Sequence, residues 1–211
     1  MTHRADDPWS AAAERMVADQ IVARGIDDPA VLEAMRTIRR HLFVPEGERA
    51  RAYEDGPLSI GRGQTISQPY IVALMTELAR LAPTSRVLEV GTGSGYQTAV
   101  LAACAREVFS VELVPELSAR AGSTLAALGV DNVHLRTGDG SLGWSEEAPF
   151  DAILVTAAAA DVPPALPDQL RVGARLVIPL GTTSQDLYVI TREPGGFRRQ
   201  SVIPVRFVPL R

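Results

Sequence analysis

The pattern that most constrains this chain begins after Pro83, where short apolar runs alternate with stretches of helical periodicity. Such alternation is typical of βαβ units arranged around a parallel sheet. Helices are predicted at 96–105, after the strand at 108–113 through Leu128, and around 165–170. Strands are predicted at RVLEV (86–90), VFSVEL (108–113), NVHLRT (132–137), DAILVT (151–156), RLVIPL (175–180) and LYVIT (187–191).

A last hairpin is expected to turn at 194–196 and to return through SVIPVRFVPL (201–210), which supplies a seventh strand. The fold class is therefore α/β, with a doubly wound, mostly parallel, seven-stranded sheet of the Rossmann-like kind. Ligands of such sheets bind at the carboxyl ends of the strands. We expect the functional residues to lie there.

The segment before the sheet is predicted to be helical at both ends. An amphipathic helix runs from Trp9 to Arg24, a short helix follows Asp28, and a third helix begins at Pro69 and ends before Pro83. Between them, residues 41–68 contain repeated Gly and Pro and are expected to form loop or short strand. We interpret 1–211 as a single domain, with 1–82 as the N-terminal segment and 83–211 as the sheet.

Composition excludes several kinds of chemistry. All 21 basic residues are arginines, which rules out Schiff-base chemistry, a lysine general base and a P-loop lysine. The single cysteine, Cys104, stands in an apolar run and is predicted to pack in the core of a protein from a reducing compartment. His3, His41 and His134 lack metal-ligand spacing, so no metal site is expected.

Charge and hydropathy argue against nucleic acid and membranes as partners. The net charge is −4 and the pI is near 5.4, so the chain has no broad attraction to phosphate backbones or anionic lipid. The doublets Arg39–Arg40 and Arg198–Arg199 are predicted to be solvated. The N-terminus lacks the pattern of a signal peptide, and no run approaches the ~20 apolar residues that span a bilayer. We expect a cytoplasmic location.

The glycine-rich turn after the first strand of the sheet indicates a nucleotide-like ligand. In EVGTGSGY, Gly91, Gly93 and Gly95 lack side chains that would keep a ligand from the backbone at a helix N-terminus. The dinucleotide fingerprint GxGxxG would need glycine at Tyr96. The GxGxG pattern, with Glu89 two residues ahead, favours S-adenosylmethionine over a dinucleotide.

Two further acids follow the next strands. Glu112 could accept hydrogen bonds from both ribose hydroxyls, although such an acid also occurs in dinucleotide sites. Asp139, in the GDG sequence with Gly140, could accept from the exocyclic amine of adenine. Each feature alone is more often an ordinary turn or strand end. Three of them at successive strand ends favour a bound adenosine.

The segment IGRGQTISQPY (60–70) brings polar groups together just before a helix, without a base to activate them. Ser67 has two interpretations that the sequence leaves open, a helix cap and a residue of the active site. A nucleophilic serine is the weaker functional role, because no histidine or carboxylate lies close in sequence.

Taken together, these motifs show that the chain resembles the protein-L-isoaspartate O-methyltransferase family of class I S-adenosylmethionine-dependent methyltransferases. The resemblance covers nearly the whole chain, and GQTISQP is its most specific element. The matching segments are GQTISQP (63–69), VLEVGTGSGYQTA (87–99), GDG (138–140), APFDAILVTAA (148–158), QLRVGARLVIPLG (169–181) with Gln185, and RFVPL (206–210).

The resemblance implies that Ser67 is the catalytic residue, beside the transferable methyl group. It also implies a set of residues that contact S-adenosylmethionine and its product S-adenosylhomocysteine. That set is Thr65, Ile66, Ser67, Glu89, Gly91, Thr92, Gly93, Ser94, Gly95, Glu112, Asp139, Gly140 and Gln185.

The implied substrates are isoaspartyl-containing proteins and peptides, whose methyl ester then cyclises to a succinimide. We expect the protein to be a monomer. The acceptor is a free α-carboxylate with a pKa of about 3.5, so it is ionised at neutral pH and needs no general base. Ser67 would orient it. Two alternatives remain: a carboxyl methyltransferase dedicated to one peptide, and a non-catalytic adaptor of the same fold.

Overall fold

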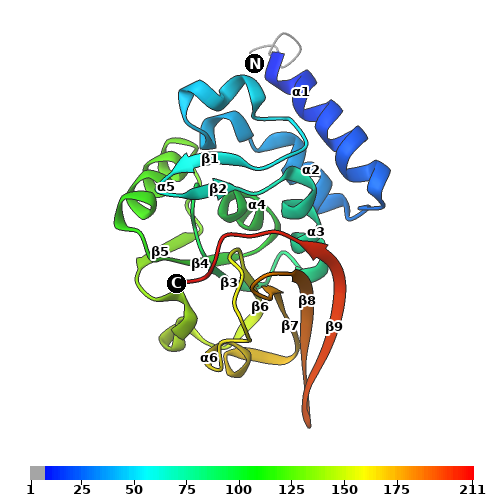
Figure 1. The fold of residues 1–211 in the computed structure, drawn as a ribbon, viewed down its shortest axis with the longest axis vertical. Helices are drawn as coiled ribbons and strands as arrows, with labels where there is room; N and C mark the ends of the chain where they lie inside the picture. The colour runs from blue at the N-terminus through cyan, green and yellow to red at the C-terminus, as the bar shows by residue number, and fades with distance from the viewer. Residues whose placement is uncertain (1–7) are drawn as a thin grey trace.

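A seven-stranded sheet forms the centre of the computed structural model, which describes residues 8–211 (Figure 1). The strand order is β5-β4-β3-β6-β7-β8-β9. The first five strands in this order are parallel, whereas β8 is antiparallel to both of its neighbours. The strands are β3 (Arg86–Val90), β4 (Glu107–Glu112), β5 (Val133–Thr137), β6 (Phe150–Val155), β7 (Leu170–Leu180), β8 (Gln185–Glu193) and β9 (Gly196–Val205). The predicted fold class is confirmed.

Both faces of the sheet are covered, which explains the continuous apolar runs of its strands. Along β3, Val87 joins the core on one face and Leu88 the core on the other, because successive side chains of a strand alternate. The first core also takes in the larger helices, and the second takes in Leu166 of the short helix α6. The helices are α3 (Pro69–Ala79), α4 (Tyr96–Cys104), α5 (Pro115–Ala127) and α6 (Ala165–Asp168).

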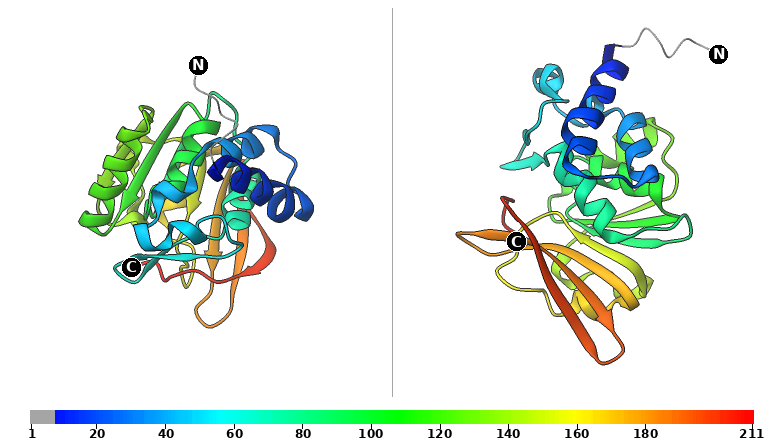
Figure 2. Two further views of the ribbon diagram at one scale, coloured as in Figure 1. Left: turned by 90° about the horizontal axis from the view of Figure 1, so that it is seen from above. Right: turned by 90° about the vertical axis from the view of Figure 1, so that its right-hand side faces the viewer.

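The first helical segment begins with α1 (Pro8–Met16), continues as a π-helical turn over Val17–Ile21 and a 3-10 turn over Val22–Arg24, and ends at Gly25. Gly25 has a φ of +89°, a conformation that favours glycine at a helix C-terminus. The second helix, α2 (Pro29–Thr37), is capped by the Asp28 side chain, which accepts from two backbone amides. These helices lie together at one end of the molecule (Figure 2).

The glycine-rich connection is more ordered than predicted. It contains 3-10 turns at Arg40–Phe43 and Glu46–Arg51, then an antiparallel hairpin of β1 (Leu58–Gly61) and β2 (Gln64–Ile66). The hairpin is joined to α5 by two contacts. Arg120 donates to the Ile60 carbonyl at 2.7 Å, and Arg62 pairs with Glu116 at 2.9 Å.

Several predicted elements near the C-terminus have wrong boundaries, including the strands predicted at 175–180 and 187–191, which span Leu170–Leu180 and Gln185–Glu193. The helix expected at 165–170 stops at Asp168, because Leu170 is fully buried and pairs with Phe150 as the start of β7. The last strand begins at Gly196 rather than Ser201 and ends at Val205. Residues 206–210 leave the sheet and run across the carboxyl ends of its strands, where Pro209 forms a bridge with Ala158.

The prediction of a solvated Arg39–Arg40 doublet is wrong for Arg40, whose side chain is 0% exposed. A doublet in sequence does not reveal which of two neighbours turns inward.

Cys104 is buried as expected. Within 8–211, no group of three or more His, Cys, Asp or Glu side chains could hold a metal ion, and His3 lies outside the described residues. None of the described helices is long and apolar enough to cross a membrane.

Candidate active site

A cavity opens at the carboxyl ends of β3 and β4, below the hairpin β1–β2. Its walls come from six places in the chain: the hairpin and the residues after it, the glycine turn, the end of β4, Gly140, the residues after β6, and the C-terminal segment. The lining residues are Arg62, Gln64, Thr65, Ile66, Ser67, Val72, Val90, Gly91, Thr92, Gly93, Ser94, Tyr96, Gln97, Val111, Glu112, Leu113, Val114, Gly140, Thr156, Ala157, Val208, Pro209, Leu210 and Arg211.

The glycine turn keeps its backbone open to this cavity. Gly91 has a φ of +100°, and a Cβ there would overlap Thr156 Oγ1. The Thr156 hydroxyl donates to the Gly91 carbonyl at 2.6 Å, which fixes the start of the turn. Gly95 also has a positive φ, +85°, and packs against Ala121 of α5. At Gly91 and Gly95, both the backbone conformation and the neighbouring atoms therefore disfavour a side chain.

Glu112 lines the cavity at the end of β4 and is held there by backbone amides. The Gly93 N–H donates to Oε2 at 2.8 Å, and the Val114 N–H donates to Oε1 at 2.9 Å. A carboxylate has about four acceptor positions, so these two bonds leave capacity for two more. The geometry joins Glu112 to the glycine turn and leaves it able to accept hydroxyl groups from a ligand.

Glu89 lies behind the turn and does not line the cavity. It is fully buried, and Oε2 accepts from the hydroxyls of Thr98 and Ser110, both at 2.6 Å. Burial raises the pKa of the Glu89 carboxyl to about 8, with a smaller contribution from the negative charge of Glu112. Ser110 also shares a 2.6 Å hydrogen bond with Thr92, which does line the cavity. The contact from Glu89 to the cavity is therefore indirect.

Asp139 and Gly140 of the GDG segment have different structural roles. Gly140 lines the cavity, and a Cβ there would overlap Val90. The Asp139 side chain is exposed and accepts from the Ser141 N–H at 2.9 Å, so it caps the 3-10 turn Gly140–Leu142. Asp139 itself is not among the lining residues.

Ser67 lies between β2 and α3, and it is not the cap of that helix. The N-cap position is Gln68, and no side chain caps α3. Within 8–211, the Ser67 hydroxyl forms no hydrogen bond, while its carbonyl accepts from Arg40. The helix-cap interpretation is therefore wrong, and the hydroxyl is available to a ligand.

Gln185 acts on the cavity through the C-terminal segment. Its Oε1 accepts from the Phe207 N–H at 2.6 Å, and its Nε2 donates to the Phe207 carbonyl at 3.2 Å. Gln185 does not line the cavity, but the residues after Phe207 do. The side chain thus fixes the segment that forms one wall.

Sequence reasoning missed Thr156, Val114 and the final residues as part of the site. Thr156 directly follows β6, so its place at the carboxyl edge of the sheet could have been recognised from the strand pattern. The segment RFVPL matched a family motif but was predicted to be strand. Its departure from the sheet depends on Gln185, a contact across 22 positions of the chain.

A second cavity adjoins the first one. Thr65, Ser67, Thr156 and Val208 line both, and Phe207 lines only the second. The remaining residues of the second cavity are Pro57, Gln68, Ile71, Pro204, Val205 and Arg206. Ser67 therefore stands at the junction of two spaces, which suits a group that contacts two ligands. In the described chain, no histidine, cysteine or lysine lines either cavity.

The chain matches the family model for protein-L-isoaspartate(D-aspartate) O-methyltransferase over residues 11–211. It is 56% identical to the protein-L-isoaspartate O-methyltransferase of a Picosynechococcus strain, with 97% of this chain and 92% of that protein covered. It is 58% identical to the enzyme of that name from Opitutus terrae, with 93% of this chain and 85% of that protein covered. A Plasmodium falciparum crystal structure described as this methyltransferase, with bound S-adenosyl-L-homocysteine, matches with a TM-score of 0.82 and 29% identity. The match covers 98% of this chain and 99% of that chain.

Proposed function

The chain belongs to the protein-L-isoaspartate(D-aspartate) O-methyltransferase family, and we propose that Ser67, Glu112 and the glycine turn carry its reaction. That reaction is methyl transfer from S-adenosylmethionine to the free α-carboxylate of L-isoaspartyl residues in damaged proteins and peptides. The resulting ester begins repair by closing to a succinimide. The observation that carries the proposal is the free Ser67 hydroxyl at the junction of two cavities.

The residues of the first cavity fit S-adenosylmethionine. Gly91 and Gly140 line the cavity with their backbone, and a Cβ at either would overlap Thr156 or Val90, so this wall of the cavity can be built only with glycine at both positions. Glu112 retains acceptor positions for the two ribose hydroxyls, and Thr65, Ile66, Thr92 and Ser94 complete the walls. When bound, S-adenosylmethionine supplies a methyl group on a positively charged sulfur, which an ionised carboxylate can take without prior loss of a proton.

Three further residues of the expected set act on this cavity without lining it. Glu89 holds Thr92 through Ser110, and Gln185 holds the C-terminal wall through Phe207. Gly95 lets the turn enter α4 against Ala121. Asp139 is proposed to contact adenine, because its exposed carboxylate retains acceptor capacity beside Gly140.

Ser67 is proposed to orient the acceptor carboxylate by donating a hydrogen bond from its free hydroxyl. The carboxylate would lie in the second cavity and the methyl group in the first. Since the acceptor is already ionised at neutral pH, the protein's contribution is alignment and exclusion of water. Alignment of two reactants can supply about 7 kcal/mol or more of the barrier reduction.

We also propose that the enzyme is a cytoplasmic monomer folded as one domain. The support for one domain is that one hydrophobic core joins residues of α2 to β3, β6 and β7. A single buried cysteine suits a reducing compartment. The net charge of −4 argues against nucleic acid as a partner.

The test is transfer of a labelled methyl group to an isoaspartyl peptide and to its normal aspartyl twin. The proposal expects label on the isoaspartyl peptide, and its loss as the ester closes to succinimide. Several isoaspartyl peptides of unrelated sequence should all be labelled. Label on only one of them would favour the dedicated carboxyl methyltransferase, and label on none would contradict the proposal.

A further inference from the structure

Arg40 is a buried cation that the methyl-transfer account does not use. It begins the 3-10 turn Arg40–Phe43, its side chain is 0% exposed, and among the described residues it forms no ion pair with a carboxylate. Burial of a charge without a partner is costly. We therefore ask which part of the structure depends on the buried Arg40 side chain.

Its contacts lead to the active site. Nη2 donates to the Ser67 carbonyl at 2.7 Å, and Nε donates to the Ala52 carbonyl at 2.7 Å. The guanidinium also lies over the ring of Tyr96, 4.9 Å from its centroid. Tyr96 directly follows the glycine turn and lines the first cavity. One planar group therefore touches both the Ser67 segment and the helix that begins at the turn.

Ser67 has little else to fix its backbone. The first backbone bond of α3 runs from the Val72 N–H to the Gln68 carbonyl, so the Ser67 carbonyl lies just outside the helix. Pro69 has no N–H to offer. The direction of the Ser67 carbonyl fixes the peptide plane after Ser67, which is one of the two planes that together set the direction of the Ser67 side chain.

We propose that Arg40 is a positioning residue for methyl transfer, which sets the Ser67 hydroxyl at the junction of the two cavities by binding the Ser67 carbonyl. This inference rests on the proposed role of Ser67. The two N–H groups that bind Ser67 and Ala52 belong to one rigid planar fork, whereas a lysine ammonium has no such fork.

The first experiment compares Arg40→Met and Arg40→Lys with Arg175→Met. Arg175 also donates to a backbone carbonyl, that of Leu78 at 2.9 Å, and lines neither cavity. Rates are counted per binding site for S-adenosylhomocysteine, well below the melting temperatures. Both Arg40 variants should lower kcat on an isoaspartyl peptide at least fivefold and change the Kd for S-adenosylhomocysteine less than threefold. Arg175→Met should lower the melting temperature and leave kcat within twofold.

The second experiment tests whether Arg40 acts through Ser67. In a Ser67→Ala background, Arg40→Lys should lower kcat less than twofold, because the hydroxyl that Arg40 positions is gone. An unchanged kcat for Arg40→Lys in the wild-type background overturns the inference, as does the full fivefold loss in the Ser67→Ala background. Arg40→Lys decides the question if Arg40→Met fails to fold. A wild-type enzyme without activity on isoaspartyl peptide overturns the proposed function itself.

Discussion

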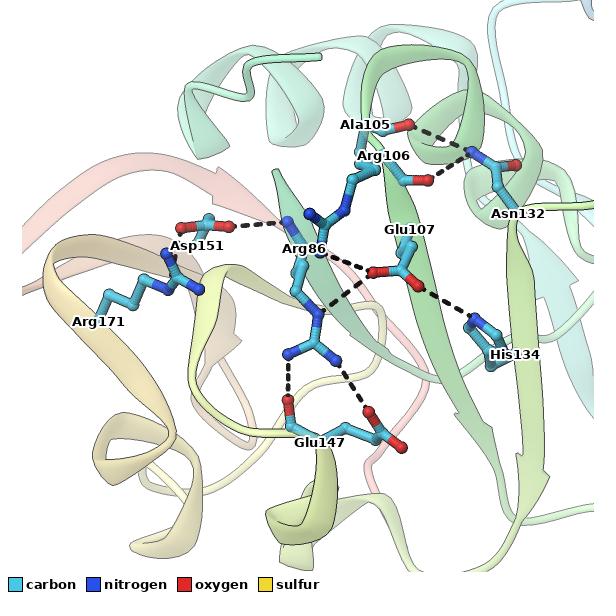
Figure 3. Close-up of polar contacts among 9 residues, drawn as sticks. All are labelled: Arg86, Ala105, Arg106, Glu107, Asn132, His134, Glu147, Asp151 and Arg171. Atoms are coloured by element: carbon cyan, nitrogen blue, oxygen red, sulfur yellow. Dashed lines mark hydrogen bonds and ion pairs between the residues drawn. The ribbon is translucent and has the colours of Figure 1, made fainter. Parts of the chain in front are cut away.

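The two ends of β3 and β4 differ in the partners of their charged side chains. At the amino end, Arg86 pairs with Glu147 at 2.8 Å and with Glu107 at 3.3 Å, and its backbone N–H donates to Asp151 (Figure 3). At the carboxyl end, Glu89 and Glu112 accept only from hydroxyls and backbone amides, with no ion pair among the described residues.

The difference separates a structural cluster from a functional site. Acids and bases at the amino end satisfy one another, and the Arg86 guanidinium also lies 4.8 Å from the centroid of the Phe109 ring. Little capacity remains there for a ligand. At the carboxyl end, acceptor capacity is left over and faces a cavity, which is the condition for binding a ligand rich in hydroxyl and amine donors. Mutations at the two ends should therefore change different measurements.

The largest effect on stability is expected for Arg86→Met. Its side chain is only 18% exposed, and its removal leaves Glu147 without its ion pair and takes one of two arginines from Glu107, at a cost of about 2 kcal/mol of unfolding free energy. Denaturant unfolding should show this loss, while the Kd for S-adenosylhomocysteine stays the same. Arg106→Met is the control, because Arg106 pairs with the same Glu107 from an exposed position and should cost less than about 1 kcal/mol. Equal losses of unfolding free energy in the two variants would show that Arg86 contributes no more to this cluster than the exposed Arg106.

Glu112→Ala should have the largest effect on ligand binding. Loss of a charged acceptor weakens binding by roughly 1.5 to 3 kcal/mol, and calorimetry with S-adenosylhomocysteine measures it. The control stands at the other end of the same strand: Glu107→Ala should leave this affinity unchanged. If the two variants bind equally well, the contrast between the ends of β4 is wrong.

Ser67→Ala should lower kcat on isoaspartyl peptide by ten- to a hundredfold, since one orienting hydrogen bond contributes about 1 to 3 kcal/mol. Its melting temperature should match the wild type, because the hydroxyl has no partner among the described residues. Ser59→Ala, in the same hairpin segment, serves as the control and should keep the wild-type rate. A wild-type kcat in Ser67→Ala would show that another group orients the acceptor.

Glu89→Gln should change how stability depends on pH. The carboxyl titrates near 4.5 when unfolded and near 8 when folded. Between these values the folded state holds one more proton than the unfolded state, so wild-type stability falls as pH rises, by at most about 1.4 kcal/mol per pH unit. The variant lacks this contribution, and its unfolding free energy relative to the wild type should rise from pH 5 to pH 8. A constant difference over this range would contradict a protonated Glu89.

The sequence predicted the sheet and its ligand edge because both depend on local patterns. Strand runs, the glycine turn and the acid after β4 can be recognised in short windows. The burial of Arg40 could not be recognised in a short window, because its partners Ala52 and Ser67 are 12 and 27 positions away. The same limit applies to Gln185, whose partner Phe207 becomes a neighbour only when the C-terminal segment turns back across the sheet.

Glu89 and Glu112 show what local patterns leave undecided. Both are acids near a turn at a strand end, and both were expected to contact the ligand. Glu112 is the last residue of β4 and reaches the cavity, whereas Glu89 lies one residue inside β3 and points into the interior. Only the position of each strand's end relative to its neighbours separates these two roles.

We propose that methyl transfer here needs no general base, and this can be checked by measuring the single-turnover rate on an isoaspartyl peptide between pH 5.5 and 7.5. The acceptor α-carboxylate, with a pKa of about 3.5, is ionised throughout this range. Glu89, which titrates near 8, stays protonated for most of it. We expect a rate that varies less than twofold. A rate that rises tenfold per pH unit would reveal a group that must lose its proton before transfer, and would rule out transfer without a general base.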